Sequence, residues 1–252
     1  MRAVQKTLEG KSTVVTGSAS GIGKATALLF ARQGARVVVA DINEEAGRET
    51  VRAICEEGGQ ATFLRTDVRE ADDVKEMIDF AVRTYGRLDV LVNNAGIGHR
   101  IPVHRCTEED WENVIATNLT GVFLGCKYGV QAMLRQEGGV IVNIASGAGL
   151  LGAPRSPAYS AAKGGVVVLT RQIADDYAQD GIRINAVCPG AVDTPLMDVV
   201  YHEISDDLEE GKRIYESRLT RGRLLAPEEV AHAVLYLASD ETAFITGNPF
   251  FV

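Results

Sequence analysis

Two side chains one helical turn apart could move a proton. Tyr159 and Lys163 are four positions apart in a segment of helical length, so they lie on the same helix face. A phenol has a pKa near 10 and is a weak base at neutral pH. A neighbouring ammonium group favours the phenolate and lowers that pKa. We therefore expect Tyr159 to act as a general acid/base assisted by Lys163.

A serine and an asparagine extend this pair toward a catalytic set. Ser146 ends an apolar run 13 residues before Tyr159, and its hydroxyl could polarise a carbonyl oxygen. Asn118 stands in an otherwise apolar helical stretch, where an unpaired amide is costly, and it could hold a water molecule beside Lys163. The alternative roles are structural: a strand-end cap for Ser146 and a buried hydrogen bond for Asn118.

The elements that must position these residues follow from the hydrophobic pattern. Short β-branched runs alternate with longer amphipathic segments, which predicts βαβ units and a parallel sheet covered on both faces. Right-handed crossovers then make a doubly wound α/β fold. The predicted strands are 12–16, 36–40, 62–65, 90–93, 140–144 and 182–187, and the predicted helices are roughly 21–33, 44–57, 70–85, 107–136, 157–180 and 227–239.

A glycine-rich turn joins the first predicted strand to the first predicted helix. Glycines let the backbone turn tightly and approach a pyrophosphate, and the helix N-terminus supplies unpaired N–H groups and a positive dipole. The turn is therefore a candidate dinucleotide-binding site. Its residues are Gly17, Ser20, Gly21, Ile22 and Gly23, in a GxxxGxG spacing.

A carboxylate at the end of the second strand predicts which dinucleotide binds. Asp41, followed by Ile42, lies 24 residues after Gly17 and could accept hydrogen bonds from both ribose hydroxyl groups of NAD. It would repel the 2′-phosphate of NADP, and residues 40–43 contain no Arg or Lys that would bind it. We therefore expect NAD in preference to NADP. The alternative is that Asp41 only caps the next helix.

Later strand ends carry further candidate cofactor contacts. Ligands of open α/β sheets bind beyond the carboxyl ends of the strands, where these residues fall. Asp67 could meet an adenine edge, and the small residues after the fourth strand allow close approach of a ligand. The candidates are Asp67, Val68, Asn94, Ala95 and Gly96.

These motifs together resemble the short-chain dehydrogenase/reductase family, over nearly the whole chain from about residue 8. The residues that carry the resemblance are Thr16, Gly17, Gly21, Ile22, Gly23, Asp67, Asn93, Asn94, Ala95, Gly96, Asn118, Ser146, Tyr159, Lys163, Pro189, Gly190 and Thr194. The resemblance implies a single-domain Rossmann-type fold with a seven-stranded sheet and NAD(P)(H) as the hydride carrier.

The resemblance also implies individual roles. Lys163 would bind the nicotinamide ribose and lower the pKa of Tyr159, Ser146 would orient the substrate oxygen, and Asn118 would hold the relay water. Thr194 would bond the carboxamide, with Ile22 and Val192 near the ring. Homotetramers or homodimers would form through the long helices at about 107–136 and 157–180. Relatives usually end in a short Gly-rich tail, whereas this sequence ends at 247–252, just as the last strand begins.

A long insertion follows Pro189 and Gly190. Residues 191–223 are acidic in the middle and lack strand character, which indicates a substrate loop or a solvated helical excursion. Its apolar residues could cover the substrate or pack against the domain; they are Leu196, Met197, Val199, Val200 and Tyr201. His99 and Arg100 either line the substrate entrance or lie in a solvated loop.

Composition excludes several classes of protein. The chain has 252 residues, 26 Lys plus Arg against 34 Asp plus Glu, and a net charge of −8, which argues against nucleic-acid binding. No apolar run approaches the roughly 20 residues that span a bilayer, and we expect no signal peptide. The four cysteines are far apart, and the four histidines have no metal-ligand spacing. We expect a cytoplasmic protein without a metal or disulfides.

The sequence thus predicts an NAD-dependent oxidoreductase that interconverts a secondary alcohol and a ketone. Two alternatives lie within the same family: a 3-oxoacyl-thioester (acyl-carrier-protein) reductase and a sugar dehydrogenase. Asp41 and the acidic composition oppose the first, since such reductases usually use NADPH and a basic docking surface. A third alternative is a non-catalytic nucleotide-binding scaffold, because fold alone does not establish function.

Overall fold

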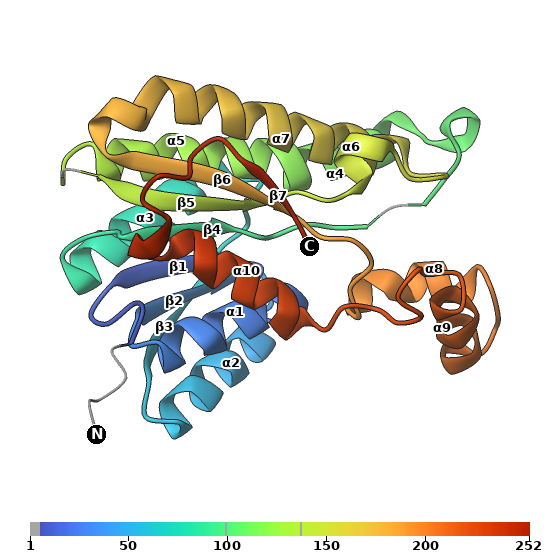
Figure 1. The fold of residues 1–252 in the computed structure, drawn as a ribbon, viewed down its shortest axis with the longest axis horizontal. Helices are drawn as coiled ribbons and strands as arrows, with labels where there is room; N and C mark the ends of the chain where they lie inside the picture. Colours follow the sequence, from blue (N-terminus) through green and yellow to red (C-terminus); the bar gives the residue numbers. More distant parts are fainter. Residues whose placement is uncertain (1–5, 99, 137) are drawn as a thin grey trace.

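A single seven-stranded parallel sheet organises the chain in a computed structural model that describes residues 6–98, 100–136 and 138–252. The strand order is β3-β2-β1-β4-β5-β6-β7, so the direction of winding reverses next to β1 (Figure 1). This confirms the predicted doubly wound fold and its seven strands. The strands are β1 (Ser12–Thr16), β2 (Arg36–Asp41), β3 (Gln60–Arg65), β4 (Val90–Asn93), β5 (Gly139–Ile144), β6 (Ile182–Cys188) and β7 (Pro249–Phe251).

Helices cover both faces of this sheet, and each face has its own apolar core. On one face pack α1 (Gly21–Arg32), α2 (Glu44–Glu56) and α10 (Pro227–Ala238). On the other face pack α3 (Ala71–Tyr85), α5 (Gly121–Met133) and α7 (Pro157–Tyr177). The central strands are buried on both sides, which explains why they read as continuous β-branched runs rather than alternating ones.

The predicted helix 107–136 is divided in the structure. A capping box between Thr107 and Asp110 starts α4 (Glu108–Ile115), and a π-helical turn (Ala116–Thr120) joins it to α5. π-Turns often occur at functional sites, and this one contains Asn118. The chain enters α7 with Pro157 in the first turn, where the missing N–H costs nothing.

The insertion after β6 is helical. It contains a short 3₁₀ turn (Pro195–Met197), α8 (Asp198–His202) and α9 (Leu208–Glu216). We call residues 191–223 the α8–α9 segment; its two helices project from the end of the sheet (Figure 1). Val200 and Tyr201 of this segment form a small apolar cluster with Leu224, the residue that follows it.

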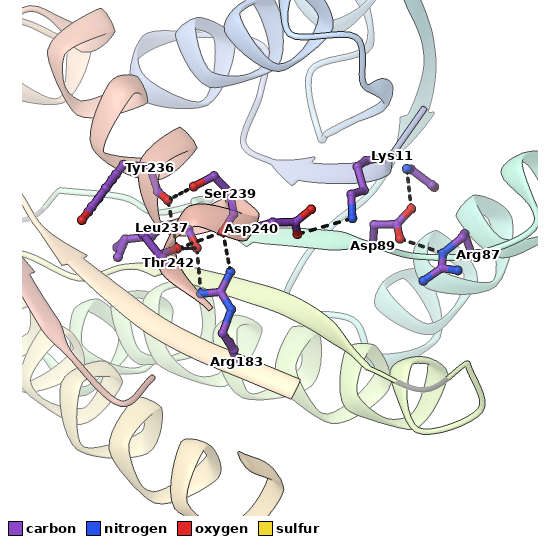
Figure 2. Close-up of polar contacts among 10 residues, drawn as sticks. Lys11, Arg87, Asp89, Arg183, Tyr236, Leu237, Ser239, Asp240 and Thr242 are labelled. Atoms are coloured by element: carbon purple, nitrogen blue, oxygen red, sulfur yellow. Dashed lines mark hydrogen bonds and ion pairs between the residues drawn. The ribbon is translucent and has the colours of Figure 1, made fainter. Parts of the chain in front are cut away.

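A polar network closes the opposite, amino-terminal edge of the sheet (Figure 2). The guanidinium of Arg183, at the start of β6, donates to the carbonyl oxygens of Leu237 (3.1 Å), Ser239 (2.9 Å) and Ile245 (3.3 Å). These carbonyls lie at and beyond the end of α10. The network therefore fixes the chain between α10 and β7, far from the carboxyl ends of the strands.

Candidate active site

Three of the four predicted catalytic side chains meet above β5. Ser146 follows β5, and its hydroxyl hydrogen-bonds the phenol of Tyr159 in the first turn of α7. Nζ of Lys163 lies 5.8 Å from the centre of the Tyr159 ring. Ser146 Oγ also accepts from the Ala148 N–H (3.1 Å), so the structural role considered for it coexists with the contact to Tyr159.

The pKa of Tyr159 differs from the sequence expectation. We expected Lys163 to lower it, but burial raises the pKa of this phenol above its ordinary value of 10. The hydrogen bond from Ser146 only partly offsets that effect. Desolvation prevails because it disfavours the phenolate, while the ammonium is several ångströms from the ring.

Lys163 is held at the floor of the site. Its side chain is buried, and Nζ donates to the main-chain oxygen of Ile144 at 2.6 Å. Burial lowers the pKa of Lys163 to about 8. Most molecules therefore carry the ammonium at neutral pH. Gly149 lets the chain after β5 lie against α7 here, because a Cβ at that position would collide with the backbone of Lys163.

Asn118 is buried in the π-turn and makes two hydrogen bonds with one residue. Its Oδ1 accepts from the Ile97 N–H (2.8 Å), and its Nδ2 donates to the Ile97 carbonyl (2.9 Å). This is the structural role that we considered as the alternative. These two hydrogen bonds also hold the loop after β4 close to the catalytic residues. Gly96 in that loop is so near that a Cβ added to it would lie 3.3 Å from Asn118 Oδ1 and 3.6 Å from Lys163 Nζ.

The glycine turn fits a pyrophosphate. Ser20 begins α1 without capping it through its side chain, so the N–H groups of the first helical turn are available to an anion. Gly17 has φ +63°, and a Cβ there would lie 2.7 Å from Ala95 Cα. A Cβ on Gly23 would collide with the carbonyl of Gly17. Gly21 contacts Thr194, and half-buried Ile22 packs into the core beneath the turn.

Asp41 points its carboxylate across the end of β2. Oδ2 accepts from the Ala19 N–H and Oδ1 from the Asn43 N–H, both at 2.9 Å. These bonds fix the orientation of the carboxylate beside the glycine turn. Asn43, rather than Asp41, caps α2. Ile42 is 51% exposed next to it and offers an apolar surface to a planar ring.

Asp67 has a partner that the sequence analysis did not anticipate. Its two oxygens accept from the guanidinium of Arg69, which lowers the pKa of Asp67, and the Asp67 N–H donates to Asp73. The carboxylate is thus paired within its own loop rather than free for an adenine edge. Val68 packs on Gly121, at the start of α5.

Sequence reasoning missed the role of Thr16. Its hydroxyl accepts from the N–H groups of Asn94 (3.0 Å) and Ala95 (3.1 Å). Asn94 Nδ2 donates in return to the carbonyls of Thr16 (2.9 Å) and Gly17 (3.0 Å). These bonds join the ends of β1 and β4. A Thr at the end of a strand was the available signal, but its long-range partner is not visible in sequence.

The residues after β6 close the remaining side of the cofactor region. The carbonyl of Pro189 accepts from the Gly147 N–H (3.0 Å), and the Gly190 N–H donates to Val252 (3.0 Å). Val192 is buried and pairs with Leu225 in an isolated bridge. Thr194 reaches the glycine turn: a Cβ added to Gly21 would lie only 3.2 Å from the methyl group of Thr194.

The other candidates resolve as follows. Cys188 is buried, and no disulfide forms among the described cysteines. Val200 and Tyr201 pack inside the α8–α9 segment, whereas Leu196 and Val199 are exposed.

Arg100 pairs with Glu203, and His99 lies outside the described residues. Within residues 6–98, 100–136 and 138–252, no group of side chains could hold a metal and no helix could cross a membrane.

The chain belongs to the short-chain dehydrogenase/reductase family. A family model described as enoyl-(acyl carrier protein) reductase matches residues 17–252. The chain is 44% identical to a cyclohexanol dehydrogenase of Acinetobacter sp. strain SE19, covering 96% of this chain and 93% of the relative. It is 42% identical to the 3-oxoacyl-[acyl-carrier-protein] reductase FabG of Thermotoga maritima, covering 96% and 95%. The crystal structure of a levodione reductase superposes with a TM-score of 0.94 at 30% identity, covering 97% and 96%.

Family membership establishes the class of reaction. The protein is an oxidoreductase that acts on CH–OH donors by hydride transfer, and members of the family use a nicotinamide cofactor, NAD or NADP.

Proposed function

We propose that this protein is an NAD-dependent dehydrogenase/reductase for a secondary alcohol/ketone pair, with Tyr159 as the general acid/base. The observation that carries the proposal is the meeting of Ser146, Tyr159 and Lys163 at the carboxyl end of β5. Lys163 lies beside Gly96, on the edge of the sheet where ligands of such folds bind.

Each residue contributes one physical function. In the oxidation direction Tyr159 accepts the hydroxyl proton of the alcohol, and in reduction it returns a proton to the carbonyl oxygen. Ser146 donates a hydrogen bond to the same oxygen and so polarises it. Lys163 keeps a positive charge beneath the phenol and has N–H groups left for ribose hydroxyls. Asn118 anchors the π-turn to Ile97, which keeps the loop after β4 next to Lys163. NAD, when bound, supplies the hydride acceptor.

The preference for NAD rests on Asp41. Its fixed carboxylate stands beside the glycine turn, where two ribose hydroxyls can donate to it and a 2′-phosphate would be repelled. We expect the remaining predicted cofactor contacts to follow the carboxyl edge of the sheet from β2 to the residues after β6. They are Gly17, Ser20, Gly21, Ile22, Gly23, Ile42, Asp67, Val68, Asn94, Ala95, Gly96, Pro189, Gly190, Val192 and Thr194, and Asp67 would act through Arg69.

The similarity to a cyclohexanol dehydrogenase supports an alicyclic secondary alcohol as the first substrate to assay. The similarity to a FabG reductase keeps an acyl thioester as the second candidate. Asp41 and the net charge of −8 favour the alcohol, because they oppose NADPH and an acidic carrier protein respectively.

The decisive experiment follows nicotinamide absorbance with NAD and NADP separately, over cyclohexanol, sugars and 3-hydroxyacyl thioesters. We expect turnover of the alcohol with NAD and a loss of at least about a hundredfold in Tyr159→Phe. Residual turnover above a tenth of wild type would refute the role of Tyr159. NADH binding without turnover of any substrate would instead favour a nucleotide-binding scaffold.

We further propose that residues 1–252 act as one catalytic domain that assembles into a homotetramer or homodimer through α4, α5 and α7. Exposed apolar side chains on these helices support this assembly: Trp111, Phe123, Leu134 and Val168. The unpaired state of the four cysteines supports a cytoplasmic location.

A further inference from the structure

An ion-pair cluster joins three loops above the catalytic residues. Nε of Arg100, in the loop after β4, donates to Oε2 of Glu203 at 2.9 Å. Nη2 of Arg155, just before α7, lies 3.4 Å from the other oxygen, Oε1. Glu203 itself ends α8. We call Arg100, Arg155 and Glu203 the Glu203 cluster.

The three loops border the same space. They follow β4, β5 and β6, which are neighbours in a parallel sheet, so all three begin at the edge that carries Ser146. The loop after β5 leads directly into the helix that holds Tyr159. A single carboxylate therefore connects every loop that can surround a substrate there.

The central pair of the Glu203 cluster is less exposed to solvent than an ordinary surface ion pair. The side chains of Arg100 and Glu203 are each only 23% exposed, so their attraction is screened less than between fully solvated groups. Arg155 has φ +60° and is the one non-glycine residue with positive φ among those described. Such backbone strain persists only where surrounding contacts hold it, and it is frequent at ligand clamps.

The contacts of the α8–α9 segment with the rest of the protein lie chiefly near its two ends. In its middle, Val200 and Tyr201 pack with Leu224, which directly follows the segment, and the helices project from the sheet (Figure 1). Before α8, Leu196 approaches Gly98 and Thr194 approaches Gly21, and after α9 the guanidinium of Arg223 pairs with Glu229 of α10 at 2.6 Å. Between these two ends, the Glu203 cluster joins α8 to the loops after β4 and β5.

We propose that Glu203 is a positioning residue that holds the α8–α9 segment closed over the substrate by bridging Arg100 and Arg155. This inference rests on the proposed function for the identity of the site. Glu203 touches neither the cofactor residues nor Tyr159. It acts on substrate affinity through the position of the segment.

Amide hydrogen exchange tests the proposal without relying on activity. In Glu203→Gln we expect exchange of residues 198–216 to become about tenfold faster, because a neutral amide cannot hold two guanidinium groups. Arg213→Gln is the matched control, since it removes a cation of α9 whose partner, Glu210, lies in the same helix. Raising NaCl should accelerate exchange more in wild type than in Glu203→Gln, which keeps only the other ion pairs of the segment.

Kinetics give the second readout. In Glu203→Gln we expect KM for the alcohol to rise about tenfold, with kcat within about twofold and NADH affinity unchanged. Arg100→Lys should recover most of the wild-type KM, whereas Arg100→Gln should resemble Glu203→Gln. Equal exchange in Glu203→Gln and Arg213→Gln, or faster exchange with an unaltered KM, would overturn the proposal. If wild type turns over no substrate, the proposed function fails while exchange still decides whether the cluster holds the segment.

Discussion

The ammonium group of Lys163 sits in a nearly closed environment, with a main-chain carbonyl as its hydrogen-bond acceptor. Burial lowers its pKa to about 8, against 10.5 for an ordinary lysine. The unfolded chain therefore binds this proton more tightly than the folded protein. The charge destabilises the folded state fully below pH 8, and this penalty disappears as pH rises from about 8 to 10.5.

Lys163→Met should reveal this pH dependence. Relative to the variant, wild type should gain on the order of 3 kcal/mol in free energy of unfolding between pH 7 and pH 10.5. Urea titrations of both proteins measure the difference. Lys75→Met is the comparison, because Asp79 raises the pKa of Lys75 and the sign reverses. A wild-type minus Lys163→Met difference that does not change with pH would contradict the buried charge.

Single residues also show how far sequence reasoning reaches. The clustering of Ser146, Tyr159 and Lys163 was predictable, because strand ends of a parallel sheet share one edge. The raised pKa of Tyr159 was not, since it depends on how completely neighbouring side chains exclude water. The pairing of Asp67 with Arg69, and of Glu203 with Arg100, depends on loop conformations that hydrophobic periodicity does not encode.

At the scale of elements, the strands were predictable because burial on both faces selects β-branched residues. The start of β3 was missed, since Gln60 and Ala61 carry no such preference. The π-turn at Ala116–Thr120 was also missed: it adds one residue to a helical turn, and the hydrophobic pattern continues through it. The sequence analysis offered helices in residues 191–223 only as the alternative to a substrate loop, and it did not locate α8 and α9, because their apolar residues pack chiefly on one another.

The Arg183 network predicts which polar contact at the amino edge stabilises the fold. Arg183→Met removes three hydrogen bonds and leaves partly buried carbonyls of Leu237, Ser239 and Ile245 without a donor, so we expect a loss of about 2–4 kcal/mol. Chemical denaturation at neutral pH measures this loss in free energy of unfolding.

Lys11→Gln is the control in the same region (Figure 2): its pair with Asp240 is exposed, so its loss should cost less than about 1 kcal/mol. Equal losses in the two variants would show that Arg183 contributes no more than a surface charge.

At the scale of the whole molecule, apolar side chains are exposed on two opposite faces. Phe123 of α5 and Val168 of α7 are 46% and 65% exposed on one side of the sheet. Tyr236 of α10 is 43% exposed at the other side, where it packs against Phe250 of β7. Each face could pair with its own copy around a two-fold axis. Two such independent axes generate a tetramer with dihedral symmetry.

This arrangement makes a prediction that separates the two interfaces. Phe123→Glu places a charge in the first face and should convert tetramers to dimers, while Tyr236→Glu should give dimers of the other kind and the double variant monomers. Light scattering coupled to size exclusion measures the masses. Phe244→Glu is the control, because this side chain is 82% exposed and projects from the loop between α10 and β7. A wild-type monomer would refute the assembly. A dimer unaffected by Phe123→Glu but dissociated by Tyr236→Glu would assign the interface to the α10 face alone, in which case the apolar surface of α5 and α7 has no role in assembly.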